Sequence, residues 1–145
     1  MEEKLQEEEC KDILKRVRKA QFELRAKEEE LEQYKKDCYS LSATDYSKEK
    51  VSGGKTTDMS DMIARLIQLR DAVNEQWDKL INFRLEANIR INNMHDPANR
   101  ALLTQRYILA KSWKQIAETL YMSEDNAKGY RHSNAIREFI KVNTN

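Results

Sequence analysis

Basic and amide side chains gather in the last third of the chain, and their chemistry suits contact with nucleic acid. Residues 100–145 hold eight Lys or Arg residues against four acidic ones, although the whole chain carries a net charge of only +1. Lys and Arg bind phosphates or base edges, and an Asn amide reads adenine in a DNA groove. The residues that we expect to contact double-stranded DNA are Lys111, Lys114, Ser123, Asn126, Lys128, Arg131, His132 and Arg137.

Catalytic and metal-binding patterns are not found in the sequence. There is no phosphate-binding glycine loop, no G-x-S-x-G nucleophile motif and no H-E-x-x-H metal motif. The two cysteines, Cys10 and Cys38, do not make a disulfide framework or a metal site, and a redox role for them stays open. We therefore expect no enzyme activity, no metal and no cofactor.

Helix-start signals place the basic residues on three short helices. Asp96 before Pro97 is typical of a helix start, Ser112 followed by Gln115 fits a capping box, and Ser123 can cap a last helix. Apolar residues at helical spacing follow, and these helices with their short turns predict a helix-turn-helix. The packing candidates of its last two helices are Trp113, Ile116, Ala117, Leu120, Ala127, Tyr130, Ala135, Ile136, Phe139 and Ile140.

The segment from Pro97 to Ser123 resembles region four of bacterial sigma factors. The residues that carry this resemblance are Pro97, Arg106, Tyr107, Ser112, Ile116, Ala117, Leu120 and Ser123. Residues 46–140 also resemble small phage and prophage transcriptional regulators of the ArpU type. The resemblance implies control of phage gene expression by DNA binding, with a contact to host RNA polymerase.

The predicted last helix departs from the sigma pattern in three ways. Glu124 and Asp125 suit the positive end of a helix dipole but face phosphates poorly, and Gly129 inside a helix costs about 1 kcal/mol relative to Ala. The spacing from Ser123 to Ala135 is one residue longer than the pattern. Two functions therefore remain: a DNA-binding transcription regulator, or a coiled-coil interaction module that docks RNA polymerase or another protein without reading DNA.

Two long amphipathic helices are predicted before this domain. Apolar residues recur every seven positions in both, which is typical of a coiled-coil seam. We expect a homo-oligomer, whose seam residues are Val17, Leu24, Leu31, Leu66, Val73 and Leu80. A hairpin of the two helices, or packing against the terminal domain, would satisfy the same pattern. The residues that widen the second stripe are Ile63, Ile67, Trp77, Ile81 and Ile91.

The predicted fold is all-α, with long coiled-coil-like helices followed by a small sigma-region-four-like helix-turn-helix domain. The expected segments are a heptad helix at 1–39, a linker at 40–57, an amphipathic helix at 58–94 and the helix-turn-helix domain at 95–145. No stretch approaches the roughly 18–20 apolar residues of a membrane helix. We therefore expect a cytoplasmic protein of a bacterial host cell, with no membrane contact.

Overall fold

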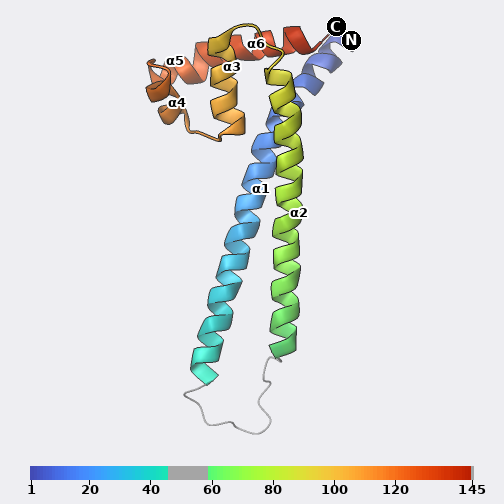
Figure 1. Ribbon diagram of the computed structural model, residues 1–145, viewed down its shortest axis with the longest axis vertical. Coiled ribbons are helices and arrows are strands. Elements are labelled where there is room, and N and C mark those ends of the chain that lie inside the picture. The colour runs from blue at the N-terminus through green and yellow to red at the C-terminus, as the bar shows by residue number, and fades with distance from the viewer. Residues whose placement is uncertain (46–58, 145) are drawn as a thin grey trace. The chain divides into compact units, whose positions relative to one another are not determined.

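The fold is all-α, as predicted. The computed structural model describes residues 1–45 and 59–144, with side chains described for residues 1–41 and 59–144, and these residues contain no strand. The elements in order are α1 (Glu2–Asp45), α2 (Met59–Ile91), α3 (Pro97–Leu103), the π-helical turn η1 (Thr104–Ile108), α4 (Trp113–Thr119), α5 (Glu124–Asn126), the π-helical turn η2 (Ala127–Arg131) and α6 (His132–Asn143), and Figure 1 shows them in colour order.

The chain forms two compact units whose limits fall inside the long helices. Unit 1 combines Met1–Gln21 with Leu80–Asn145, and unit 2 is Phe22–Lys79. Helix α1 continues to Asp45, past the end that we predicted at residue 39, and residues 46–57 of the predicted linker lie outside the described residues. None of the predicted internal segment ends therefore coincides with a limit of the two compact units.

Unit 2 is an antiparallel pair of helical segments from α1 and α2 (Figure 1). Its apolar interior follows the predicted heptads, because Leu24 and Leu31 of α1 and Leu69 and Val73 of α2 are buried. The Arg65 guanidinium lies 3.5 Å from the Glu30 carboxylate, and it joins the two segments at the surface. An exposed pair of this kind contributes about 0–1 kcal/mol, so apolar packing holds the pair together.

The residues expected at an oligomer seam are covered within the single chain, which corrects that prediction. Val17 and Leu80 are 0% and 1% exposed in unit 1. In unit 2, Leu24, Leu31 and Val73 are buried and Leu66 is half-buried. A helix of the same chain covers these side chains without the loss of translational and rotational freedom that a second chain would add.

The residues expected to widen the stripe of α2 divide into two sets. Ile91 is fully buried in unit 1. Ile63, Ile67, Trp77 and Ile81 are instead exposed. The apolar residues of α2 therefore belong to two different faces of the helix, and only one of them is covered.

Unit 1 has a closed apolar core. Side chains from α1, α2, α3, α4 and α6 are at most 2% exposed, and among them are Leu14, Leu80, Leu103, Ile116 and Phe139. The Asn143 amide donates to the Arg90 carbonyl at 3.1 Å and to the Phe139 carbonyl at 2.8 Å, and this ties the end of α6 to α2. None of the described helices is long and apolar enough to cross a membrane.

Packing candidates of the last two helices mostly lie inward, as predicted. Ile116, Ala117, Ala127, Ala135 and Phe139 are buried. Trp113, Leu120, Ile136 and Ile140 are half-buried. The prediction that Tyr130 packs in the core is wrong, because its side chain is 67% exposed.

Candidate functional site

All three predicted helix starts in the candidate site are capped. The Asp96 carboxylate accepts from the backbone N–H of Ala98 at 2.9 Å, at the start of α3. The Ser112 hydroxyl accepts from the N–H of Gln115, whose side-chain oxygen accepts in return from the N–H of Ser112, and this is the predicted capping box. The Ser123 hydroxyl accepts from the N–H of Asn126 at 3.1 Å, so it is already used by the helix start.

A four-residue turn from Leu120 to Ser123 joins α4 to the last helix. The N–H of Met122 donates to the Ala117 carbonyl at 3.0 Å, which closes the end of α4 in a Schellman motif. Tyr121 occupies the left-handed position of that motif with φ 55°, where glycine is usual. Its side chain is 96% exposed, so packing against residues 1–41 and 59–144 does not account for the choice of Tyr.

The last helix contains a π-helical turn near its start. Elements α5, η2 and α6 follow one another without interruption from Glu124 to Asn143. A π turn holds about one residue more than an α turn. Gly129 lies in η2, and a Cβ added there would meet no atom within 4 Å. The fold of the single chain therefore does not require glycine at this position.

Four side chains fix the last helix against the helices before it. The Tyr107 hydroxyl lies 2.9 Å from Nε2 of His132, and the Trp113 ring packs edge-on against the His132 ring with centroids 4.9 Å apart. The Arg106 guanidinium lies 4.3 Å from the centre of the Trp113 ring and donates to the Lys111 carbonyl at 3.2 Å. We name Arg106, Tyr107, Trp113 and His132 the aromatic cluster.

Burial sets the protonation of the aromatic cluster. Burial and the nearby Arg106 charge lower the pKa of His132, so its neutral ring is favoured. Burial raises the pKa of Tyr107, so the phenol keeps its proton near neutral pH. The rings of Tyr107, Trp113 and His132 are therefore uncharged near neutral pH, and Arg106 is the charged member of the cluster.

The residues expected to contact DNA do not all face solvent. Lys114, Ser123, Asn126, Lys128 and Arg137 are exposed. Lys111 and Arg131 are half-buried. His132 belongs to the aromatic cluster, so its ring is held against Tyr107 and Trp113. The exposed members on the first half of the last helix are thus Asn126 and Lys128, and exposed Tyr130 lies between them and α6.

The second half of the last helix borders the start of α1. An open groove of about 690 Å³ is lined by Glu7 and Lys11 of α1 and by Ser133, Ile136 and Arg137 of α6, among others. Arg137 therefore shares its surroundings with a carboxylate of α1. The first half of the helix, from Glu124 to Tyr130, does not line this groove.

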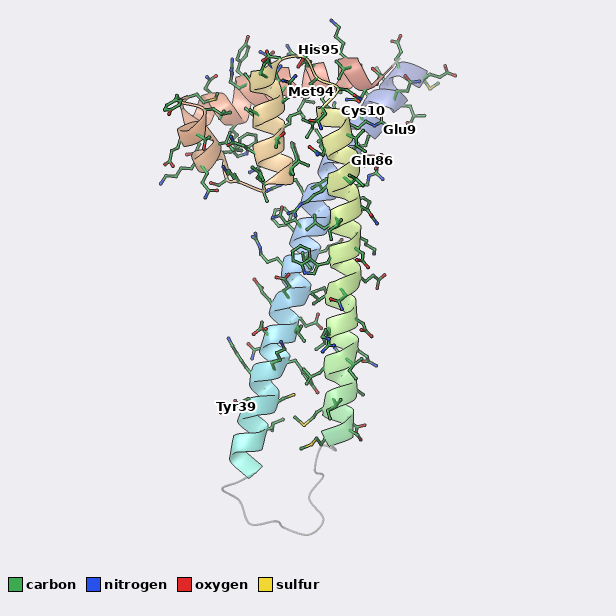
Figure 2. The ribbon with its side chains drawn as sticks, viewed as in Figure 1. Glu9, Cys10, Tyr39, Glu86, Met94 and His95 are labelled. Atoms are coloured by element: carbon green, nitrogen blue, oxygen red, sulfur yellow. The ribbon has the colours of Figure 1, made fainter. Side chains whose placement is uncertain are left out.

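A smaller cavity of about 360 Å³ adjoins Cys10. Glu86, Arg90 and Asn143 are among its other lining residues, and Figure 2 labels Cys10 and Glu86. Burial raises the pKa of the Cys10 thiol, which disfavours the thiolate that nucleophilic or redox chemistry needs. Within residues 1–45 and 59–144, no group of three or more His, Cys, Asp or Glu side chains is placed to hold a metal ion.

Sequence reasoning missed Tyr121 and Tyr130 as exposed residues of this site. Both are large aromatic side chains on the surface beside the last helix, at 96% and 67% exposure. Tyr130 follows Ala127 by three residues, which is the spacing of a packed α-helical face. The π turn between them alters that spacing and turns Tyr130 outward, and no signal in the sequence distinguishes the two turns directly.

Comparison with known proteins places the chain in a family. A search of curated proteins finds no significant match, and a search of solved structures finds none either. One family model matches residues 40–139, which is more than half of the chain and includes α2 and nearly all of the last helix. The chain therefore belongs to the family described as "Protein of unknown function (DUF1492)".

Proposed function

We propose that this protein is a transcription regulator that binds double-stranded DNA through the first half of its last helix. The observation that carries the proposal is the exposure of Asn126, Lys128 and Tyr130 above a closely packed support. An amide, an ammonium and an aromatic ring are the groups that read base edges and bind phosphates. Among the described side chains, none of these three forms a hydrogen bond, an ion pair or a ring contact.

The support beneath this surface is suited to presenting a helix to a groove. Caps at Ser112 and Ser123, the closed turn at Met122 and the aromatic cluster fix α4 and the last helix relative to each other. In a helix-turn-helix the first helix crosses the DNA backbone while the second enters the major groove. Exposed Lys114 on α4 would then contact phosphate.

The resemblance to sigma region four and to ArpU-type phage regulators supports the same proposal. The extra residue in the last helix is the main departure from that pattern, and the π turn η2 offers a place for it. Gly129 adds a further argument, because a residue without a side chain allows the closest approach of a partner to the helix backbone.

The test is selection of bound duplexes from a random DNA pool, followed by fluorescence anisotropy with the enriched sequence. We expect binding that weakens steeply between about 50 and 200 mM salt. Lys128→Ala should reduce the salt slope by about 1. Lys36→Ala removes the same charge from an exposed position on α1 in unit 2 and should leave binding unchanged. Folded protein without enrichment or salt-dependent binding would contradict the proposal.

The second candidate function is docking of RNA polymerase or another protein without reading DNA. Exposed Glu124 and Asp125 favour it, because two carboxylates at the start of the last helix oppose DNA phosphates. Charge reversal of both residues to Lys should then abolish binding to purified bacterial RNA polymerase. Reversal of the exposed acids Glu2 and Glu3 serves as the control. If the first proposal holds, reversal of Glu124 and Asp125 to Lys should instead strengthen DNA binding.

A further inference from the structure

Helix α2 has a second apolar face that the described residues of the chain leave open. The helix is unbroken from Met59 to Ile91, and at 100° per residue its buried and exposed apolar residues fall on different sides. The exposed side chains of this face are between 40% and 71% accessible, and they are Met59, Ile63, Ile67, Trp77, Ile81, Leu85 and Ile89. Apolar side chains in a row of this length indicate a partner rather than scattered surface residues. We name these seven residues the open face.

Three polar residues interrupt the open face at its middle. Arg70, Asn74 and Asp78 lie at the same angular positions on the helix as the apolar residues, and all three are exposed. Neither Arg70 nor Asp78 has an ion-pair partner among the described residues of the single chain. The centre of the open face thus carries one free positive and one free negative charge.

Six of the seven residues of the open face lie in pairs at equal distances from Asn74. Ile67 and Ile81 lie seven residues before and after Asn74. Ile63 and Leu85 lie eleven residues before and after it, and Met59 and Ile89 lie fifteen residues before and after it. Arg70 and Asp78 lie four residues to either side, so the charges at equivalent distances are opposite. Two copies of α2 placed antiparallel with Asn74 against Asn74 would match apolar with apolar and Arg70 with Asp78 at both ends of the polar centre.

We propose that the open face binds a second copy of this chain, antiparallel, with a twofold axis at Asn74. A twofold interface requires that when residue i meets residue j, residue j also meets residue i. Six of the seven residues of the open face satisfy this with an apolar counterpart, and Trp77 would meet Asp71. A parallel arrangement would set Arg70 against Arg70 and Asp78 against Asp78, which like-charge repulsion disfavours. A buried Asn pair at the centre would fix the register, as single polar residues do in coiled coils. This pairing does not depend on DNA binding.

The first test measures the mass of the full chain by light scattering and sedimentation. The wild type should have about twice the chain mass of 17.2 kDa at micromolar concentration. Arg70→Asp should weaken the dimer by at least about tenfold, since it replaces two attractive pairs with two repulsive ones. The double variant Arg70→Asp/Asp78→Arg should restore it. These residues are eight apart, so one helix cannot pair them internally. A wild-type monomer, or a double variant no better than the single one, would overturn the proposal.

The second test reads the direction of the two helices by disulfide trapping. Asn74→Cys in a Cys38→Ser background, in which Cys10 stays buried, should form a covalent dimer on mild oxidation. Asn88 is exposed near one end of the open face, and Asn88→Cys should not form this dimer, because antiparallel helices separate the two copies of residue 88. Circular dichroism confirms that both variants fold. Trapping at both positions would mean a parallel dimer and would contradict the proposed axis.

Discussion

The stretch from Ser112 to Ser123 and the stretch from Asn126 to Arg131 are neighbours in the chain but differ in what holds them. The first stretch is held by a capping box at its start, by buried Ile116 and by a closed end of α4. The second contains a π turn, a glycine without a packing neighbour and exposed Lys128 and Tyr130. The first stretch is fixed by its own hydrogen bonds and core contacts, whereas the second places Ala127 in the core and leaves Lys128 and Tyr130 exposed.

The largest expected effect contrasts the core beneath the last helix with exposed Tyr130 of the second stretch. Phe139 is fully buried, so Phe139→Ala should lower the free energy of unfolding by about 3–5 kcal/mol. Tyr130→Ala removes an exposed ring on the same helix and should change it by less than about 0.5 kcal/mol. Urea unfolding followed by circular dichroism measures both. Equal losses would mean that Tyr130 belongs to the scaffold after all.

The second effect is expected in the response to acid, through His132, which directly follows the second stretch. The pKa of His132 is lowered in the folded chain, so the unfolded chain binds its proton first as the pH falls. The contribution of neutral His132 to the free energy of unfolding is fully present above the unfolded pKa of about 6.5. As the pH falls below that value, this contribution is lost by at most about 1.4 kcal/mol per pH unit. His132→Gln should flatten the dependence of unfolding free energy on pH between about 7.5 and 5.5. Identical slopes in both proteins would contradict this account of the aromatic cluster.

A third difference lies in the capping box. Ser112→Ala removes the hydroxyl that accepts from Gln115 and should lower the free energy of unfolding by about 1 kcal/mol. Ser112→Asp keeps an acceptor at the helix start and should recover most of the loss. Thermal unfolding of the three proteins compares them directly. Equal stability of the Ala and Asp variants would show that the box contributes nothing.

The smallest change should separate stability from binding. Gly129→Ala meets no atom in the fold, so it should raise the free energy of unfolding by up to about 1 kcal/mol. If DNA approaches the helix backbone there, the added methyl group should also weaken binding in the anisotropy assay. Ser133→Ala, on the exposed surface of α6, is the matched control. Greater stability with unchanged DNA binding would place the contact elsewhere on the helix.

Local features of this fold were predictable where one residue fixes one backbone group. Asp96, Ser112 and Ser123 cap the helices that their types and spacing indicate. The heptads identified the buried residues of α1 and α2, but a stripe shows only that a helix needs a partner. It does not show whether that partner is the same chain, and here the same chain covers Val17 and Leu80.

The candidate site was less predictable for a different reason. Its basic residues could be chosen by type, yet their exposure depends on how the last helix is rotated. One π turn changes that rotation, so Tyr130 faces outward, and the ring of His132 is taken up by the aromatic cluster. The charges of the site were therefore visible in the sequence, while the surface that presents them was not.

Unit 1 combines segments that lie far apart in the sequence, and this affects how the newly synthesised chain folds. The Cys10 thiol donates to the Asn143 carbonyl at 3.8 Å, across 133 residues of sequence. Joining such distant segments carries a large loop-closure entropy and is typically slow. The core of unit 1 therefore cannot close until the final turns of α6 have been synthesised, several seconds after α1 at ribosomal speeds of about 5–20 residues per second. During that interval the apolar side chains around Leu14 stay open to chaperones or to other nascent chains.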